Sequence, residues 1–326
     1  MDKVNWLKEL FKIEKRPVKG LMAYEWAVLA YTLLTTLFII CTYNKLPNPQ
    51  ALLIGRIRIM AMTGALWLVY RLAPCRVTRL ARAVAQLSLL AWWYPDTYEL
   101  NRILPNFDHL FAQIDQNFFG YQPALLFSHL IPQVWFSELM DLGYASYFPM
   151  IVAIVLFYFL FRYEDFPRAM FILTCAFFIY YVVFVFLPVT GPQYYYCAAG
   201  LDNVAAGVFP NVGDYFNHHI ERMASPGWTD GIFYQAVESA HDAGERPTAA
   251  FPSSHVGITM IILMMAWHAQ TRRQWLFWVL VPFAVLMFFA TVYIQAHYVI
   301  DAVAGLLTGI LLYILLAYIS RNYNII

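Results

Sequence analysis

Long apolar runs separated by short polar segments dominate the chain. A helix rises about 1.5 Å per residue, so roughly 20 apolar residues cross the hydrocarbon core of a bilayer. Eight segments have about this length, one of them with marginal hydrophobicity: 21–41, 52–72, 78–94, 141–161, 169–189, 252–270, 275–295 and 298–319. The pattern predicts an all-α fold, a polytopic membrane helix bundle.

The marginal segment is 78–94, which lies next to a cluster of arginines. Lys and Arg favour the cytoplasmic side of a membrane protein. The N-terminus and the other basic positions all face that side only if 78–94 also crosses; those positions are Arg162, Arg168, Arg272, Arg273 and Arg321. We therefore expect about eight transmembrane helices, with both termini inside.

The chain divides into two parts in this interpretation. Residues 1–77 hold an N-terminal amphipathic helix, over 1–20, and two transmembrane helices, while 78–326 hold a six-helix core. Two long outer segments interrupt the core. Residues 95–139 mix aromatic and polar side chains and are predicted to form interfacial helices. Residues 190–250 form a segment long enough to be a lid or a binding element.

Composition agrees with a membrane protein. Of the 326 residues, 61% are hydrophobic and 13% are charged, about half of the roughly 25% charged residues in a soluble domain. The net charge of +1 provides no basic surface of the kind that nucleic acids bind.

Two histidines stand where polar segments enter apolar runs. Pro252-Ser253-Ser254-His255 opens one run, and His297-Tyr298-Val299-Ile300-Asp301 opens another two spans later. Because one helical hairpin separates them, both histidines lie at the same face of the membrane, the extracytoplasmic one. Ionisable residues at this depth are costly and are usually functional.

The spacing of these residues predicts specific chemistry. His297 and Asp301 are four residues apart, so their side chains meet on a helix, where the carboxylate can orient the imidazole. Ser253 and Ser254 are suited to capping the helix that carries His255. The free N–H groups at such a helix start bind phosphate well. A nucleophile, an orienting acid, a second histidine and an anion site together indicate phosphoryl transfer.

The same residues resemble a known family. Phe251-Pro252-Ser253-Ser254-His255 and His297-Tyr298-Val299-Ile300-Asp301-Ala302-Val303-Ala304-Gly305 are similar to the second and third motifs of the type 2 phosphatidic acid phosphatase superfamily, over residues 78–319. The resemblance implies that His297 attacks phosphorus and forms a phosphohistidine. It also implies that His255 protonates the leaving oxygen and that Asp301 orients His297. This scheme needs no metal or other cofactor.

Two positions depart from the family pattern. Ser239 stands where the lysine of the first motif is expected, and Thr291 stands where an arginine usually precedes the third motif. A site with fewer cations favours a singly charged phosphodiester over a phosphate monoester. The pattern around Thr291 resembles the inositol phosphorylceramide synthase branch, related to sphingomyelin synthases. That branch implies a phospholipid donor and a ceramide-like lipid alcohol as acceptor, in sphingolipid metabolism.

The sequence also indicates residues for substrate binding, helix packing and the membrane interface. Ser253, Ser254, Arg246 and Tyr194 are candidates for substrate binding, although 194–196 also fit an aromatic belt at the membrane interface. The pair Gly305 and Gly309 indicates close helix packing. The remaining histidines are interpreted as interfacial side chains: His218, His219, His241 and His268.

Three alternatives remain open from the residues alone. A lipid phosphatase would use water in place of the lipid alcohol. His255, His297 and Asp301 could instead be three zinc ligands. A transporter could use the His–Asp pair as a proton relay, although no second, symmetric site is visible.

Overall fold

The computed structural model describes residues 8–269 and 274–322, and within them all regular structure is helical. An isolated bridge joins Val189 and Ala249. The α-helices are α2 (Ala23–Cys41), α3 (Pro49–Leu72), α4 (Arg76–Ser88), α5 (Leu90–Asn101), α6 (Asp108–Phe119), α7 (Pro123–Leu130), α8 (Val134–Ala145), α9 (Tyr147–Phe161), α10 (Phe166–Phe186), α11 (Pro192–Ala199), α12 (Leu201–Ala205), α13 (Ile232–Gly244), α14 (Ser254–His268), α15 (Trp275–Tyr293) and α16 (Val299–Asn322). Short 3-10 helices are η1 (Tyr43–Lys45), η2 (Tyr163–Asp165) and η3 (Tyr215–Asn217).

Several helices are long and apolar enough to cross a membrane, which identifies a multi-pass membrane protein. Five described helices meet this standard, namely α2, α3, α10 with the preceding η2, α15 and α16. A sixth span forms if α8 and α9, which meet at a 44° bend, are counted as one. The predicted helix bundle is therefore confirmed.

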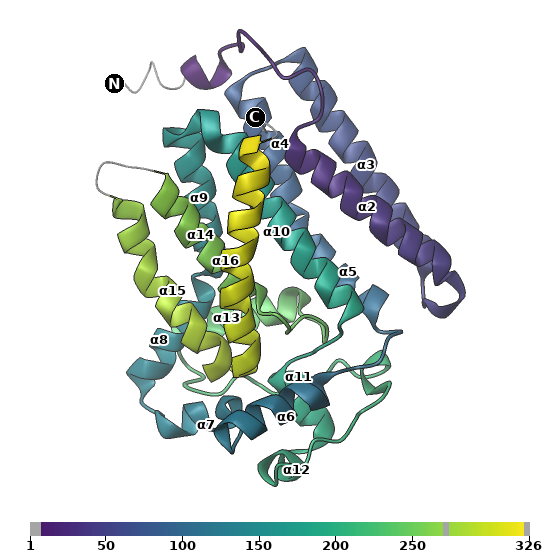
Figure 1. The fold of residues 1–326 in the computed structure, drawn as a ribbon, viewed down its shortest axis with the longest axis vertical. Helices are drawn as coiled ribbons and strands as arrows, with labels where there is room; N and C mark the ends of the chain where they lie inside the picture. The colour runs from purple at the N-terminus through teal and green to yellow at the C-terminus, as the bar shows by residue number, and fades with distance from the viewer. Residues whose placement is uncertain (1–7, 270–273, 323–326) are drawn as a thin grey trace.

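The two other predicted spans correspond to shorter elements. Helix α14 is apolar but only 15 residues long. The predicted span at 78–94 is divided between α4, with 13 residues, and α5, with 12 residues, each too short to cross a membrane alone. Figure 1 nevertheless shows α4 and α5 running from one end of the bundle towards the other, as the charge argument requires.

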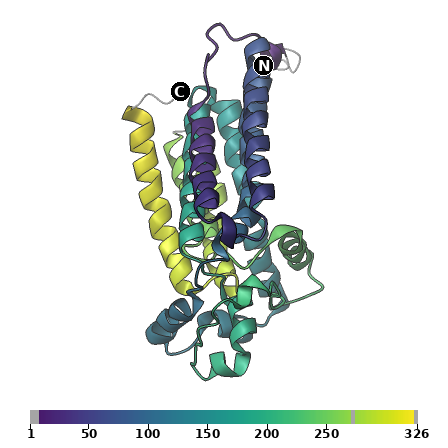
Figure 2. The same cartoon turned by 90° about the vertical axis from the view of Figure 1, so that its right-hand side faces the viewer.

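The start of α2 and the end of α16 lie at the same end of the bundle (Figures 1 and 2). The loop between α9 and α10, which carries Arg162, lies there as well. This arrangement agrees with a common side for the basic clusters. The opposite end holds α6, α7, α11 and α12 (Figure 1), which come from the two long outer segments.

Buried ion pairs join the N-terminal hairpin to the core. Arg56 of α3 contacts Asp96 of α5 at 2.7 Å, and Arg82 of α4 forms a buried pair with Glu25 of α2. Removing one partner of a buried pair typically costs about 3–5 kcal/mol, because the other charge remains desolvated. These pairs therefore fix how α2 and α3 sit against the rest of the bundle.

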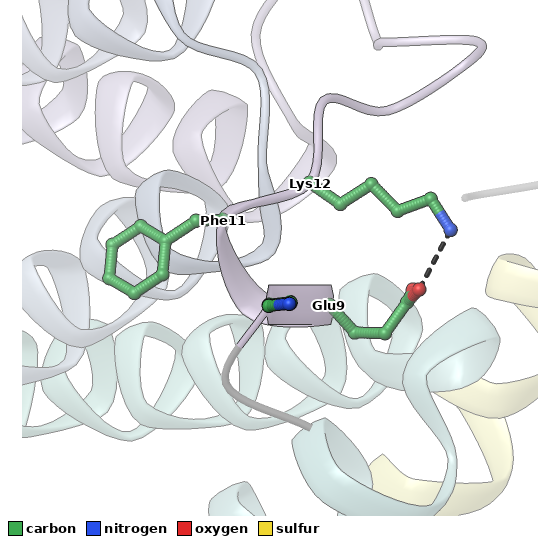
Figure 3. A pocket seen from close by; sticks show the side chains of 4 residues that line it. Glu9, Phe11 and Lys12 are labelled. Carbon is green, nitrogen blue, oxygen red and sulfur yellow. Dashed lines mark hydrogen bonds and ion pairs between the residues drawn. The ribbon is translucent and has the colours of Figure 1, made fainter. Parts of the chain in front are cut away.

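The helix predicted over residues 1–20 is shorter in the described part of the chain. Residues 8–11 are helical and 12–22 are not, while 1–7 lie outside the described residues. Lys12 pairs with Glu9 at 2.7 Å, and the exposed Phe11 side chain points away from that pair (Figure 3). Glu14 then ties this segment to the bundle through Tyr70, Arg79 and Tyr163.

Close packing of α14 against α16 places the two histidine motifs side by side. A Cβ added at Gly305 would meet the Ser253 carbonyl oxygen at 2.4 Å, and one at Gly309 would meet the Gly257 carbonyl oxygen at 2.5 Å. Larger residues at these positions would force the two helices apart. The predicted packing role of Gly305 and Gly309 is thus confirmed, and it is a typical use of small residues between membrane helices.

Candidate active site

His297 lies in the short turn that joins α15 to α16. The turn passes through Gln295, whose φ of 65° is left-handed, and the His297 amide then donates to the Thr291 carbonyl at 3.0 Å. Only 3% of His297 is exposed. The backbone therefore holds this ring inside the protein, at the start of α16.

Burial determines the charge of this imidazole. It lowers the pKa of His297 to about 4, and the nearby Ala250 carbonyl offsets part of that effect. The ring is therefore neutral at pH 7, and a neutral imidazole has a lone pair that is free to react. Its Nδ1 has no hydrogen-bond partner among the described residues.

Asp301 is buried one turn further along α16. Its Oδ2 accepts from the Tyr298 amide at 2.9 Å and lies 3.7 Å from Nδ1 of His297. The two side chains meet as the i, i+4 spacing predicts, but the contact is longer than a hydrogen bond. In this geometry Asp301 caps the helix start and lies beside His297.

His255 faces His297 from the first turn of α14. Nδ1 of His255 is 3.5 Å from Nε2 of His297. The His255 ring packs between two tyrosines of the α8–α9 bend, with centroid distances of 4.7 Å to Tyr144 and 4.4 Å to Tyr147. The structure thus brings together the three residues that the sequence singles out.

The two serines have different positions at the start of α14. Ser253 is the N-cap: its hydroxyl accepts from the Val256 amide at 3.4 Å, and its own amide donates to the Asp301 carbonyl at 3.0 Å. Ser254 is buried beside His255 at the wall of a cavity. The amides of Ser254 and His255 begin the helix without a backbone partner, which leaves a place for an anion.

Two carboxylates of α6 also support this site, and the sequence argument missed them. Asp115 accepts from the amides of Val299 at 2.8 Å and Ile300 at 3.1 Å, so it caps the start of α16. Burial raises the pKa of Asp115 to about 6, although these two hydrogen bonds lower it.

Asp108 lies on the same buried face of α6, seven residues earlier. It accepts from the Tyr298 hydroxyl at 3.0 Å and from the amides of Thr190 at 2.6 Å and Gly191 at 2.9 Å. Burial raises the pKa of Asp108 against these hydrogen bonds. Two acids seven residues apart on one helix face were the available signal in the sequence.

Arg246 and Tyr194 lie beside the loop that leads to His255. The Arg246 guanidinium donates to the Glu245 carbonyl at 2.8 Å and makes no hydrogen bond to His255 or His297. Burial and the Glu245 carboxylate raise the pKa of Tyr194, whereas Arg222 and Arg246 lower it. These residues thus form a polar cluster with Glu245, next to the histidines.

His241 belongs to this cluster, and its interpretation as an interfacial side chain is wrong. It is buried at the end of α13, with Nε2 3.2 Å from Oε2 of Glu245. The edge of the Tyr144 ring, which stacks on His255, also contacts the His241 ring, at a centroid distance of 5.6 Å.

A cavity of about 740 Å³ leads from this cluster into the bundle. Apolar side chains of α4, α5, α9 and α10 form most of its wall, and Ser254, His255, His241 and Glu245 form its polar end. Val84, Val152 and Leu156 on its wall are exposed on membrane-facing helices. A long apolar cavity with a few polar groups at one end suits a lipid.

Metal ligation receives no geometric support in this part of the chain. Within residues 8–269 and 274–322, no group of three or more His, Cys, Asp or Glu side chains is arranged to hold a metal ion. The interpretation of His255, His297 and Asp301 as zinc ligands does not fit their arrangement.

Comparison with known proteins places this geometry in a family. No curated protein and no solved structure matches the chain significantly. A family model described as the PAP2 superfamily matches residues 109–315, which include most of α6, the outer segment 190–250 and both histidine motifs. Membership supports a function of the lipid phosphatase or phosphotransferase type. The match covers more than half of the sequence, and the chain therefore belongs to the PAP2 superfamily.

Proposed function

We propose that the protein is a lipid phosphotransferase that moves a phosphorylated head group from a phospholipid to a lipid alcohol through a phosphohistidine. The observation that carries the proposal is the facing pair of imidazoles, 3.5 Å apart, beside an apolar cavity that reaches the membrane-facing helices. The substrate class that this supports is a lipid with a phosphodiester head group.

In the first step, Nε2 of the neutral His297 attacks phosphorus. The P–N bond forms as the bond between phosphorus and the leaving oxygen breaks, and His255 in its protonated, imidazolium form donates its proton to that oxygen and becomes neutral. The charge of Asp301, 3.7 Å from Nδ1, favours the imidazolium that develops on His297. The amides at the start of α14 are placed to bind a phosphoryl oxygen.

In the second step, a hydroxyl group attacks the phosphohistidine. His255 takes the proton of that hydroxyl, the new P–O bond forms, and the P–N bond to His297 breaks. A lipid alcohol gives a new phosphodiester, as in the inositol phosphorylceramide synthase branch, whereas water gives the lipid phosphatase alternative. No metal takes part in this scheme.

The surroundings of Thr291 support a phosphodiester donor. Thr291 is fully buried, and its hydroxyl donates to the Phe288 carbonyl of its own helix at 3.0 Å. This position therefore supplies no cation to a phosphate. A phosphodiester, with one negative charge, needs less compensation than a monoester dianion.

The proposed active site is extracytoplasmic. It lies towards the end of the bundle that is opposite to the start of α2 and the end of α16 (Figure 1). Under the positive-inside rule, the end with Arg162 and Arg321 faces the cytoplasm.

Product analysis of the purified enzyme tests this function. With a phospholipid that carries an alcohol head group and with a ceramide-like alcohol, we expect a new phosphodiester, and little free phosphate from phosphatidic acid. His297→Gln should lose both products, because the covalent path is removed. Rapid release of phosphate from phosphatidic acid without any diester would favour the lipid phosphatase, and full activity of His297→Gln would contradict the phosphohistidine.

A further inference from the structure

The polar end of the cavity holds an acid–imidazole pair that the proposed reaction does not use. His241 and Glu245 are four residues apart at the end of α13, and both line the cavity together with His255. The side chain of His241 is 3% exposed and that of Glu245 is 15% exposed. Helix α13 packs on α8, which fixes the pair against the site.

This pair has unused hydrogen-bonding capacity. Neither ring nitrogen of His241 nor Oε2 of Glu245 completes a hydrogen bond of good geometry with the described residues, although Nε2 lies 3.2 Å from Oε2 of Glu245 and Nδ1 lies 3.6 Å from Oε1 of Glu238. Buried polar groups are nearly always partnered, and an unpartnered one costs roughly 1–3 kcal/mol. Buried polar groups with incomplete hydrogen bonds at the wall of a cavity therefore point to a ligand.

The neighbouring charges restrict the chemistry of that ligand. Arg222 is already paired with Glu238 at 2.9 Å and Asp242 at 3.3 Å, so the Glu245 carboxylate has no ion pair with it. A phosphate would be repelled by this carboxylate, and a cationic head group would meet Arg222 and Arg246 beside it. A neutral hydroxyl fits both partners, since it donates to a carboxylate and accepts from an imidazole N–H.

The position of His241 and Glu245 suits the lipid alcohol acceptor of the proposed reaction better than the phospholipid donor. One Tyr144 ring contacts both His241 and His255, and both histidines line the same cavity, so a hydroxyl held at His241 shares that cavity with the base. The apolar wall of the same cavity accommodates the chains of the lipid that carries this hydroxyl.

We propose that His241 and Glu245 bind the hydroxyl end of the lipid alcohol acceptor, whose hydrocarbon chains occupy the cavity between α4, α5, α9 and α10. This inference rests on the proposed function and deepens it. It makes the pair a determinant of acceptor specificity, distinct from the phosphate site at the start of α14.

The test compares His241→Gln and Glu245→Gln with a matched pair elsewhere. His219 and Glu221 lie 3.5 Å apart on an exposed loop, so His219→Gln and Glu221→Gln are the controls. We expect the cavity variants to raise the KM for a ceramide-like alcohol about tenfold or more, as for the loss of a hydrogen bond to a charged group. The KM for the phospholipid donor should change much less, and the control variants should change neither.

Direct binding of a radiolabelled ceramide-like alcohol to the purified full-length protein separates this inference from the proposed function. Wild type should bind it, and both cavity variants should bind it about tenfold more weakly at an unchanged melting temperature. Binding that depends on His241, without any diester product, would contradict the proposed function and leave the acceptor site standing. The inference would be overturned if wild type did not bind the alcohol, or if wild type and the variants bound it equally. A rise in the KM for the phospholipid donor alone would also overturn it.

Discussion

A neutral, buried His297 makes the stability of the protein depend on pH. Burial lowers the pKa of His297 from 6.5 to about 4. Between these values the unfolded chain binds a proton that the folded protein does not bind. The free energy of unfolding therefore falls as the pH falls from 6.5 towards 4, by an amount on the order of 3 kcal/mol for this residue.

His297→Gln should remove this dependence. Gln does not titrate, so we expect the melting temperature of wild type in detergent to fall more steeply between pH 7 and pH 4.5 than that of the variant. Other groups, including Asp115, titrate in both proteins and cancel in the comparison. Parallel melting curves would show that His297 is protonated in the folded protein at its ordinary pKa.

The residues around the two histidines differ in how far the sequence predicted their positions. His255, His297 and Asp301 each stand at the entry of an apolar run, where an ionisable side chain is unusual. His241 gave no such signal, because it lies in a polar segment, and only the packing of α13 on α8 buries it. The spacing of Asp108 and Asp115 on one face of α6 was visible in the sequence, but their partners Tyr298 and Val299 were not, since these are far away along the chain.

At the scale of elements, the start of α16 depends on α6. Asp115 accepts from two successive amides, those of Val299 and Ile300, directly after His297. An amide side chain at this position has one oxygen and no charge, so it cannot replace both hydrogen bonds. Asp115 is therefore a positioning residue that acts through the backbone of α16.

We expect Asp115→Asn to lower kcat about tenfold or more while the KM for the phospholipid donor changes little, because the nucleophile moves and the cavity does not. The pKa of Asp115, raised to about 6, predicts that kcat of wild type falls below pH 6 as the carboxylate is protonated. That acid limb should be absent in Asp115→Asn. Asn117→Ala, on the exposed face of α6, is the matched control and should leave kcat and its pH profile unchanged. A purely structural role would lower the amount of folded protein without moving the pH profile.

Helix boundaries were predicted less well in apolar segments that also contain charged residues. The apolar runs that became α2, α3, α15 and α16 have few charges, and the sequence predicted them within a few residues. The segment 78–94 is divided at Leu89, and Arg79 and Arg82 of α4 turn inwards to Glu14 and Glu25. Such pairing depends on tertiary contacts with the N-terminal residues, which periodicity does not reveal.

At the scale of the whole molecule, the membrane orientation depends on whether α4 and α5 cross the bilayer. If they cross, every basic cluster lies on the cytoplasmic side and the candidate active site lies outside. If they do not, the residues before α4 and the outer segment 95–139 lie on the same side of the membrane. The buried pairs of Arg56 with Asp96 and of Arg82 with Glu25 favour crossing, because they hide the charges that make this segment marginal.

Cysteine labelling decides between these orientations. Cys41 and Cys197 are exposed and Cys175 is half-buried, so these three should first be replaced by serine, while Cys75 is buried and does not interfere. Single cysteines are then introduced at Ala73, after α3, and at Phe118, at the end of α6, both of which are exposed. We expect an impermeant maleimide added to intact cells to label Phe118→Cys, and to label Ala73→Cys only after permeabilisation. Labelling of both in intact cells would mean that α4 and α5 do not cross. Labelling of Ala73→Cys alone would invert the orientation and place the facing histidines on the cytoplasmic side.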